Sequence, residues 1–366
     1  MPLVSSKESP TTMPEHLVLH ELIFKKPAGT SRGVLHTKPS WIFTYALPNG
    51  VPVQTEFPII PGLSPEYSDH QQYESKLLTF LAEVKPYVLD WSQTDFFTNR
   101  AFDQFIEKWR AFPSFIFGLE VLLLAVKAQG SNVLFDTAFT RQETTIPING
   151  LVWMGSLADM RAQAIEKITA GFETVKLKIG ALDWPQELLL LRELRAHAPA
   201  TALTIRVDAN GAFAPTEIGA VLEELARIDI HSIEQPISAG QVDEMTKLCA
   251  QTPVPIALDE ELIGINERVQ KCSLLDAIRP QYIILKPSLH GGLSGVREWI
   301  QLAEERGIGW WLTSALESAI GLSAIVQFGA CYAPKLPQGF GTGSLYTNNF
   351  PSALLVREGH ICWIND

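Results

Sequence analysis

The chain has 366 residues, enough for two or three domains of ordinary size or for one large barrel with an appendage. Hydrophobic residues make up 46% of it and charged residues 19%, a composition that excludes intrinsic disorder for most of the chain. Its 29 basic and 40 acidic residues give a net charge of −11, which repels phosphate backbones and anionic lipid surfaces, so we expect neither a nucleic acid nor a membrane as partner.

Targeting and membrane segments are not evident in the sequence. The most apolar stretch, 115–126, contains Glu120 and is far shorter than the roughly 20 residues needed to cross a bilayer. The N-terminus has no basic region followed by an apolar run, so no secretion signal is expected. Four widely spaced cysteines form neither a CxxC pair nor a disulfide pattern: Cys249, Cys272, Cys331 and Cys362. We therefore expect a cytoplasmic protein with reduced, packing cysteines.

The first 140 residues predict a tail followed by a small domain. Residues 1–14 are rich in Ser, Thr, Pro and Lys without apolar periodicity, which is typical of a disordered tail. Two β-rich segments, 16–24 and 41–47, flank a Gly-containing segment, Lys26–His36, that we expect to be a mobile loop of an antiparallel sheet. Helical periodicity then appears at 73–84, 100–109 and 114–129. Residues 15–140 thus predict one α+β domain.

After Pro147 short β-branched runs alternate with amphipathic helices. The predicted strands are 146–152, 174–179, 203–209, 231–237, 254–260, 282–288 and 309–315. The predicted helices are 157–170, 186–196, 216–227, 241–250, 266–275 and 293–306. Such βα units suit a doubly wound sheet or a closed parallel barrel. The barrel is favoured because no Gly-rich dinucleotide motif follows the first strand, and the glycine cluster at 339–343 opens no predicted helix.

Charged residues recur at the C-terminal ends of consecutive predicted strands. They are Lys176 and Lys178, then Asp208, Glu234, Asp259 and finally Lys286. In a parallel barrel these ends meet at one mouth, where barrel active sites are built. Taken singly, each carboxylate is more simply a helix cap or a turn former, and a lysine is usually solvated. The series of six at one end of the barrel favours a site.

The lysine pair carries further information. Lys176 and Lys178 are two residues apart on one strand, so both face the same side, while Val175, Leu177 and Ile179 face the other. The outer face of a barrel strand packs on helices, so the lysines are expected to point inward. Buried lysines require carboxylate partners or a lowered pKa, and the next three strands supply the carboxylates.

Three carboxylates without a nearby Cys or His set suit Mg²⁺ better than zinc. A divalent cation facing a lysine is suited to removing a proton beside a carboxylate: the metal neutralises the charge of the enediolate, and the lysine takes the proton. Phosphoryl transfer is the competing use of such a cluster, but the sequence has no P-loop.

Five motifs in order resemble the muconate-lactonizing branch of the enolase superfamily. They are Lys176-Leu177-Lys178, Arg206-Val207-Asp208-Ala209-Asn210, Glu234-Gln235-Pro236, Leu258-Asp259-Glu260 and Leu285-Lys286-Pro287-Ser288. Gaps of 30, 26, 25 and 27 residues separate Lys178, Asp208, Glu234, Asp259 and Lys286. The resemblance covers nearly the whole chain. It implies an α/β fold, a (β/α)7β TIM-like barrel over 141–335, with an α+β capping domain and a last segment, 336–366, that completes the barrel and packs on the cap.

Within that branch, softer signals are similar to the o-succinylbenzoate synthases. They lie at Thr30–Gly33, 56–58, 61–64, Pro113-Ser114, 312–318 and 341–343. The resemblance implies a Mg²⁺-dependent lyase of menaquinone biosynthesis, acting on a small-molecule carboxylate and without an obligate protein partner. Its substrate would be 2-succinyl-6-hydroxy-2,4-cyclohexadiene-1-carboxylate.

The resemblance also implies a role for each matching residue. Asp208, Glu234 and Asp259 would bind Mg²⁺, for which Mn²⁺ is a substitute. Lys178 would be the base, Lys286 would stabilise the enediolate, and Lys176 would favour the neutral form of Lys178 through like charge. Asn210, Glu260 and Arg206 would orient these groups. Ser314, Ser288 and Gly291 would contact the substrate, although a structural role is as compatible with both serines.

Two positions depart from the family pattern, and other functions stay open. His290 follows Leu289 where the family has glycine, and we expect a surface or packing residue; Glu261 replaces a serine and is expected to face solvent. An N-acylamino acid racemase or dipeptide epimerase needs the same two lysines, and a cycloisomerase is a further alternative. Epimerases of dipeptides usually carry an Asp-x-Asp motif near the last strand, which 339–347 lacks. A non-catalytic scaffold is disfavoured because the lysines and carboxylates are all retained.

Overall fold

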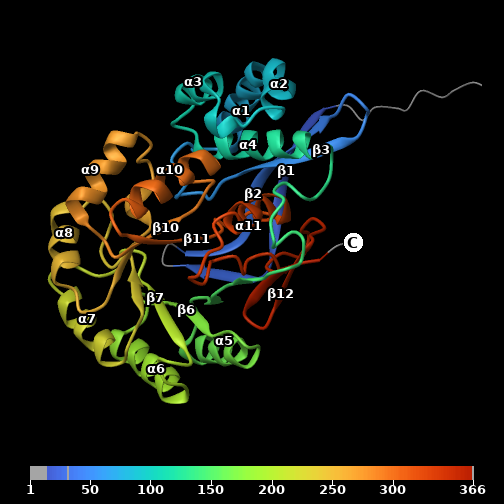
Figure 1. Cartoon of the computed structure of the whole chain (residues 1–366). Coiled ribbons are helices and arrows are strands. Elements are labelled where there is room, and N and C mark those ends of the chain that lie inside the picture. The colour runs from blue at the N-terminus through green and yellow to red at the C-terminus, as the bar shows by residue number, and fades with distance from the viewer. Residues whose placement is uncertain (1–14, 31–32, 365–366) are drawn as a thin grey trace, which may run out of the picture.

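Residues 15–30 and 33–364 are described by a computed structural model of the chain. They form a cap of strands and helices placed over a parallel barrel (Figure 1). The predicted tail, 1–14, and two positions of the Thr30–Gly33 motif lie outside the described residues. Within the described part, no helix is both long and apolar enough to cross a membrane.

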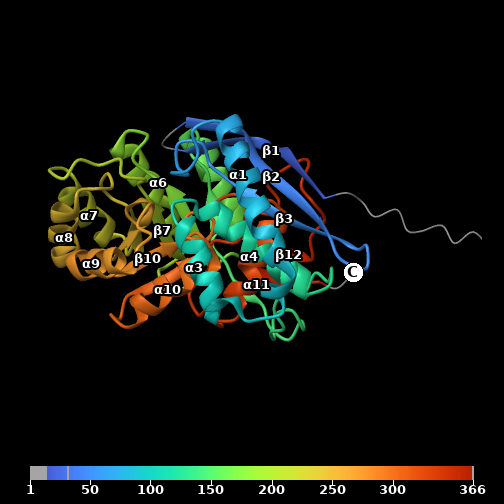
Figure 2. The ribbon, with the colours of Figure 1, turned by 90° about the horizontal axis from the view of Figure 1, so that it is seen from above.

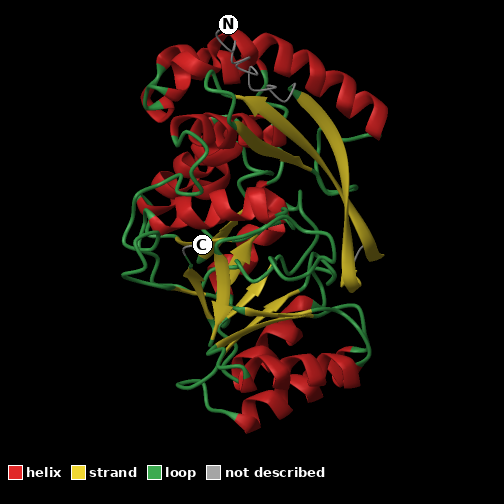
Figure 3. Ribbon diagram, turned by 90° about the vertical axis from the view of Figure 1, so that its right-hand side faces the viewer, coloured by secondary structure: helices red, strands yellow, loops and turns green. Residues whose placement is uncertain are grey.

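The cap begins with an antiparallel sheet in the order β1-β2-β3. Its strands are β1 (His16–Thr30), β2 (Gly33–Ala46) and β3 (Pro52–Pro58). The predicted loop Lys26–His36 is wrong, because β1 and β2 pair through it, with Ala28 opposite Leu35 and Gly29 opposite Val34. A register shift between Ile23 and Ala28 lets β1 pass Pro27, which has no N–H to donate. The long strands therefore reach down to the barrel (Figure 3).

The helices of the cap follow this sheet in the described chain. They are α1 (His70–Val84), α2 (Val88–Ser92), α3 (Arg100–Lys108) and α4 (Pro113–Lys127), with short 3₁₀ turns η1 (Lys85–Tyr87) and η2 (Phe96–Thr98). Helix α4 packs directly on β3. The Asp69 carboxylate caps α1 by accepting from the Gln72 N–H at 2.9 Å. Pro113 occupies the first turn of α4, where no N–H is needed. Helices α1, α3 and α4 confirm the periodicity seen in the sequence.

The barrel confirms the predicted alternation of strands and helices. Seven parallel strands lie in chain order: β5 (Gly150–Val152), β6 (Thr174–Lys178), β7 (Thr204–Asp208), β8 (Ser232–Glu234), β9 (Ile256–Leu258), β10 (Tyr282–Leu285) and β11 (Gly309–Leu312). The helices that follow them are α5 (Leu157–Thr169), α6 (Trp184–His197), α7 (Ile218–Arg227), α8 (Val242–Gln251), α9 (Arg268–Ile278), α10 (Gly292–Glu304) and α11 (Ala319–Ala330), with a turn η3 (Glu260–Leu262) after β9.

A short eighth segment closes the barrel. Gln338 forms a parallel bridge with Ile148, and Gly339 forms one with Thr313, so this segment lies between the first and last strands of the sheet. The closed (β/α)7β barrel is thereby confirmed and a doubly wound sheet excluded. Seen from above, the barrel lies beside the cap helices (Figure 2).

The end of the chain contacts both parts. A hairpin, β12 (Leu354–Arg357) and β13 (His360–Trp363), pairs with β4 (Ile146–Pro147) just before the first barrel strand. Before that hairpin, the Lys25 N–H donates to the Leu345 carbonyl at 2.8 Å, and Phe24 bridges Tyr346. The C-terminal segment therefore joins β1 of the cap to the barrel.

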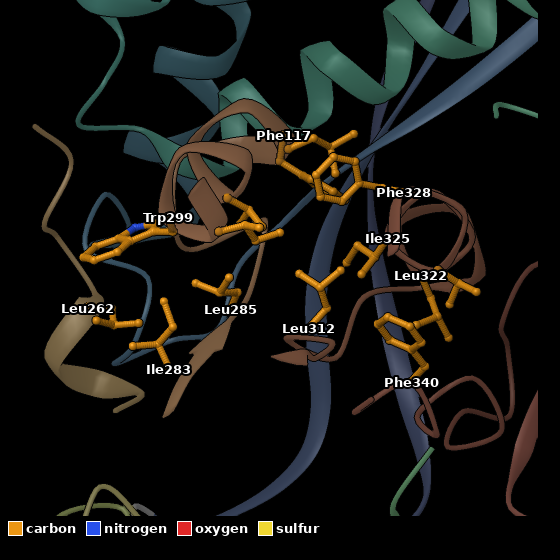
Figure 4. Packing of buried hydrophobic residues seen from close by; sticks show 14 of the residues in the cluster. Phe117, Leu262, Ile283, Leu285, Trp299, Leu312, Leu322, Ile325, Phe328 and Phe340 are labelled. Atoms are coloured by element: carbon orange, nitrogen blue, oxygen red, sulfur yellow. The ribbon is translucent and has the colours of Figure 1, made fainter. Parts of the chain in front are cut away.

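Apolar side chains pack between the barrel strands, their helices and the cap (Figure 4). Ile283, Leu285 and Leu312 leave the strands on the outer face and meet Trp299 of α10 and Phe328 of α11. Phe117 of α4 joins the same cluster, so the cap and the barrel share one core.

Candidate active site

The charged floor of the site consists of side chains that point into the barrel, because side chains alternate in direction along each strand. Val175 and Leu177 are buried in the outer core, while Lys176 and Lys178 are each 13% exposed and border an internal cavity. The inward orientation expected for the lysine pair is therefore observed. On the neighbouring strand, Asp208 pairs in register with Lys178, which places the carboxylate beside the ammonium group.

Three lysines and three carboxylates gather at the strand ends in two ion-paired groups. Lys176 Nζ lies 2.8 Å from Asp208 Oδ2 and 2.5 Å from Glu234 Oε2. Lys178 Nζ lies 2.7 Å from the same Asp208 oxygen. Across the barrel, Lys286 forms a close ion pair with Asp259. The structure thus brings together the six residues at strand ends that the sequence singled out.

Asn210 links this cluster to the next strand end. It accepts from Lys178 Nζ at 2.8 Å through Oδ1, and its amide donates to Glu260 Oε1 at 2.9 Å. Its own N–H donates to Asp208 Oδ1 at 3.0 Å, in a left-handed conformation with φ 44°. Asn210 therefore orients Lys178 and Asp208 together, as an Asx-type turn does.

The charges of the cluster depend on burial and on each other. Burial opposes ionisation of Asp208, but Lys176 and Lys178 outweigh it and hold the pKa of Asp208 well below its usual range. Burial, followed by repulsion from Asp208, raises the pKa of Glu234 far above normal. Burial acts to lower the pKa of Lys286, yet Asp259 raises it overall. The two neighbouring carboxylates therefore differ: the lysines favour the ionised form of Asp208, whereas burial makes the ionised form of Glu234 costly.

The donor set fits a hard divalent cation. It consists of carboxylate oxygens, and Asp259 Oδ1 is buried without a hydrogen-bond partner among the described residues. As the side chains lie, no three acidic, His or Cys groups of residues 15–30 and 33–364 converge as a ready metal site. Lys176 contacts both Asp208 and Glu234, and Lys286 contacts Asp259, so ammonium groups lie at the oxygens that a cation would bind. A cation would enter by displacing these ammonium contacts.

A cavity of about 220 Å³ lies above this floor. The cap supplies an apolar roof, with Val34 and Leu35 from the start of β2 and Ile60 and Leu63 from the loop after β3. The other walls come from strand ends of the barrel: Asn149, Leu151, Trp153, Thr313, Ser314, Ala315, Leu316, Gly339, Gly341 and Thr342. The cavity therefore combines a charged floor with a largely apolar roof.

The three residues expected to contact substrate do not lie in one site. Ser314 borders the cavity, but its hydroxyl donates to Glu317 Oε2 at 2.6 Å and accepts from the Leu316 N–H at 2.9 Å. Ser288 is buried outside the cavity lining and donates to Glu317 Oε1 at 2.5 Å. Gly291 precedes α10 and borders a separate crevice with Ser294. The structure does not bring Ser288 or Gly291 into the cavity.

Arg206 and His290 are buried next to the charged floor, outside the lining of the cavity. Arg206 is buried, donates to the Pro337 carbonyl at 2.8 Å and stacks 4.0 Å from the Trp311 ring; burial lowers its pKa to about 10. His290 is buried, and its Nδ1 accepts from the Lys286 N–H at 3.0 Å. Burial lowers the pKa of His290 to about 3, so the ring is neutral. His290 is a packing residue, not a surface one.

Glu261 corrects a prediction. It was expected to face solvent, but it is buried, accepts from the Gly240 N–H at 3.0 Å and from Gln235 Nε2 at 3.2 Å. A carboxylate next to a strand end can bind loop N–H groups as well as solvent, and the sequence does not distinguish the two.

The sequence interpretation missed a buried polar cluster at the edge of the site. Glu317 lies between Ser288 and Ser314, and Lys38 and Glu56 of the cap lie nearby, 3.9 Å apart. Burial raises the pKa of Glu317 and lowers that of Lys38. The spacing Ser-x-x-Glu in 314–317 is the signal that could have indicated the serine–carboxylate bond.

Fold and site together define an acid–base enzyme of the parallel-barrel class, with lysines on two sides of a carboxylate floor. Comparison with known proteins makes this specific. The family model "Enolase C-terminal domain-like" matches residues 159–362, and the chain belongs to the enolase superfamily.

Several relatives cover almost the whole chain. An o-succinylbenzoate synthase of Desulfotalea psychrophila is 46% identical over 354 residues, 93% of this chain and 96% of that protein. The crystal structure of MenC from the same organism has a TM-score of 0.83 at 40% identity and covers 96% of this chain and 100% of its own. The L-Ala-D/L-Glu epimerase of Bacillus subtilis has a TM-score of 0.79 at 20% identity, with 96% of each chain covered, and so shares the fold.

Proposed function

We propose that the protein is an o-succinylbenzoate synthase, which dehydrates 2-succinyl-6-hydroxy-2,4-cyclohexadiene-1-carboxylate in the cytoplasm as a step of menaquinone biosynthesis. The observation that carries this proposal is the cavity, in which Lys178 and Lys286 border a carboxylate floor beneath an apolar roof. A carboxylated ring with an acidic C–H bond suits such surroundings. The identity of 46% to a protein of that name, along nearly all of both chains, supports the same substrate.

Asp208, Glu234 and Asp259 are the proposed ligands of one divalent cation, Mg²⁺, with Mn²⁺ as a substitute. Their oxygens are the donors that hard cations prefer, and the unpaired Asp259 Oδ1 supports this assignment. When bound, the cation neutralises negative charge that develops on the substrate carboxylate. Asn210 would orient Lys178 and Asp208, Glu260 would hold Asn210, and Arg206 would place a positive charge behind Glu234.

Lys178 transfers the proton in the proposed reaction, and the other two lysines supply positive charge. Lys178 Nζ takes the proton from the carbon beside the carboxylate, and the electron pair of that C–H bond passes into the enediolate. The C–OH bond then breaks with its electron pair, Lys178 returns the proton to the departing oxygen, and water leaves as the ring becomes aromatic. Lys286, on the opposite side, offsets the negative charge of the enediolate. Lys176 lies on the same face of β6 as Lys178 and keeps positive charge beside it.

A racemase of N-acylamino acids is the second candidate, because Lys178 and Lys286 border the same cavity from β6 and β10. Two bases on opposite faces of one carbon are what racemisation needs. A dipeptide epimerase is less well supported. Asp208 and Glu234, the carboxylates in the described lining, both pair with lysines, so neither is free to bind a substrate ammonium.

The test is the aromatisation of the cyclohexadiene, followed by ultraviolet absorbance with Mg²⁺ and repeated in EDTA. Lys178→Ala removes the base and is expected to lower kcat by at least about 1,000-fold, near the middle of the range for acid–base catalysis. Lys247→Ala is the matched control, since Lys247 is 67% exposed and pairs with Glu244 away from the cavity.

The outcomes separate the candidates. Metal-dependent turnover that Lys178→Ala abolishes and Lys247→Ala retains supports the synthase. Absence of turnover in the native protein would refute it. N-acylamino acids in deuterium oxide then test the racemase, since α-carbon exchange requires one lysine and inversion requires both.

A further inference from the structure

The cap contacts the barrel through a buried carboxylate at the start of α10. Glu120 of α4 is fully buried and accepts hydrogen bonds from the Leu293 N–H, from the Ser294 N–H at 3.1 Å and from the Ser294 hydroxyl. These N–H groups belong to the first turn, where a helix leaves its donors unpaired. A Cβ at Gly292 would collide with Glu120 Oε2, so the glycine permits the contact.

A second cap carboxylate does the same at the next helix. Glu56 of β3 accepts from the Ser318 N–H at 2.9 Å, the Ser318 hydroxyl at 2.6 Å and the Gly321 N–H at 3.0 Å, at the start of α11. A Cβ at Gly321 would again meet the carboxylate. The first turns of two neighbouring barrel helices, α10 and α11, therefore donate hydrogen bonds to carboxylates of the cap. Helix α4 packs against both helices.

The start of α10 is tied to Lys286 by a short loop. The Lys286 N–H donates to His290 Nδ1 at 3.0 Å, and the His290 N–H donates back to the Lys286 carbonyl at 3.0 Å. The Gly292 N–H donates to the Pro287 carbonyl at 2.9 Å. These bonds close the loop on itself and His290 is buried, so the loop and the first turn of α10 form one hydrogen-bonded unit.

We propose that Glu120 is a positioning residue that couples the cap to Lys286. It holds the first turn of α10 against α4, and the closed loop passes that position on to Lys286. Glu120 does not border the cavity, so it acts without touching substrate. The functional consequence rests on the proposed role of Lys286 in catalysis, whereas the mechanical coupling does not.

The experiment compares three variants by steady-state kinetics with saturating Mg²⁺. Glu120→Gln replaces one carboxyl oxygen, an acceptor, by an NH₂ group that cannot accept a hydrogen bond, at nearly constant volume. A displacement of a reacting group by about 1 Å costs on the order of a hundredfold, so kcat is expected to fall about tenfold to a hundredfold with KM within about twofold. Ser294→Ala removes one donor and should give a smaller fall. Glu83→Gln makes the same change on the cap surface, where Glu83 pairs with Lys108, and should leave kcat unchanged.

The double variant tests whether the two residues act as one unit. If Glu120 works through the start of α10, adding Ser294→Ala to Glu120→Gln lowers kcat no further. Additive losses, or an unchanged kcat in a Glu120→Gln protein whose melting temperature has dropped, would overturn the proposal. The milder Ser294→Ala keeps the test available if Glu120→Gln does not fold.

Amide hydrogen exchange separates this inference from the proposed function. In Glu120→Gln the amides of Lys286 and His290 should exchange at least about tenfold faster, while the loop after Lys178 is unchanged. This measurement needs no turnover. An inactive native protein would therefore refute the synthase, and hydrogen exchange would still test the coupling. Unchanged exchange at 286–291 would refute the coupling itself.

Discussion

Replacing Lys176 by methionine tests the electrostatics of the floor directly. Lys176 Nζ is 2.8 Å from Asp208 and 2.5 Å from Glu234, and both carboxylates are almost fully buried. Methionine keeps most of the side-chain volume but removes the charge. Asp208 retains Lys178 at 2.7 Å, so Glu234 is the group left without its near cation.

Breaking a buried ion pair by removing one partner costs about 3–5 kcal/mol. Glu234 limits the loss by taking up a proton, because burial and Asp208 already raise its pKa. We therefore expect about 3 kcal/mol for Lys176→Met in EDTA. With an unfolding entropy of about 2.1 cal/mol/K per residue, this corresponds to a drop of about 4 °C in melting temperature.

Calorimetry in EDTA and in Mg²⁺ measures this. A divalent cation replaces the missing charge, so Mg²⁺ at a hundredfold excess over its Kd should stabilise Lys176→Met by about 2.7 kcal/mol. The native protein should be stabilised less, because there the cation competes with the Lys176 ammonium. Lys271→Met is the control: Lys271 is buried, but its partner Glu298 is 29% exposed, so a loss near 1 kcal/mol without a Mg²⁺ response is expected. A Lys176→Met protein as stable as the native one in EDTA would refute the reasoning.

Two other perturbations have defined outcomes. Burial raises the pKa of Glu120 to about 8 from about 4.5. Between these two pH values the folded state therefore keeps a proton that the unfolded chain has lost. The contribution of Glu120 to the free energy of unfolding is full below pH 4.5 and is lost as the pH rises to 8, by about 1.4 kcal/mol per pH unit. Chemical unfolding of Glu120→Gln between pH 5 and 8 should show a shallower fall than the native protein, and equal slopes would contradict this assignment. In Gly339→Ala the new Cβ would collide with Thr313 where the eighth segment closes the barrel, so a loss of about 1–3 kcal/mol is expected by urea unfolding; native stability would show that the closing segment can shift.

The barrel and its lysines were predictable because their signals are local. A strand buried on both faces is a short β-branched run, and the alternation of Lys176 and Lys178 with apolar residues fixes which side faces inward. The carboxylates at strand ends follow once the strands are placed, since parallel strands all end at the same mouth.

Elements defined by tertiary surroundings were not predictable in this way. Helix α11 is apolar on nearly all sides because it lies between the barrel and the cap, and it therefore lacks an amphipathic stripe. The strands through Lys26–His36 form despite Gly and Pro because pairing and a register shift absorb them. Ser288 was predicted to contact substrate. Its hydrogen-bond partner Glu317 lies far away in the sequence and comes close because β10 and β11 are neighbouring strands.

Buried carboxylates outside the cavity recur behind the strand ends that carry the charged floor. Glu187 accepts from the Gly180, Ala181 and Leu182 N–H groups after Lys178, at 2.7, 3.2 and 2.9 Å. Glu261 does so after Glu234, and Glu120 after Lys286. Each satisfies loop donors that water cannot reach, so the geometry of the floor depends on acids that never meet substrate.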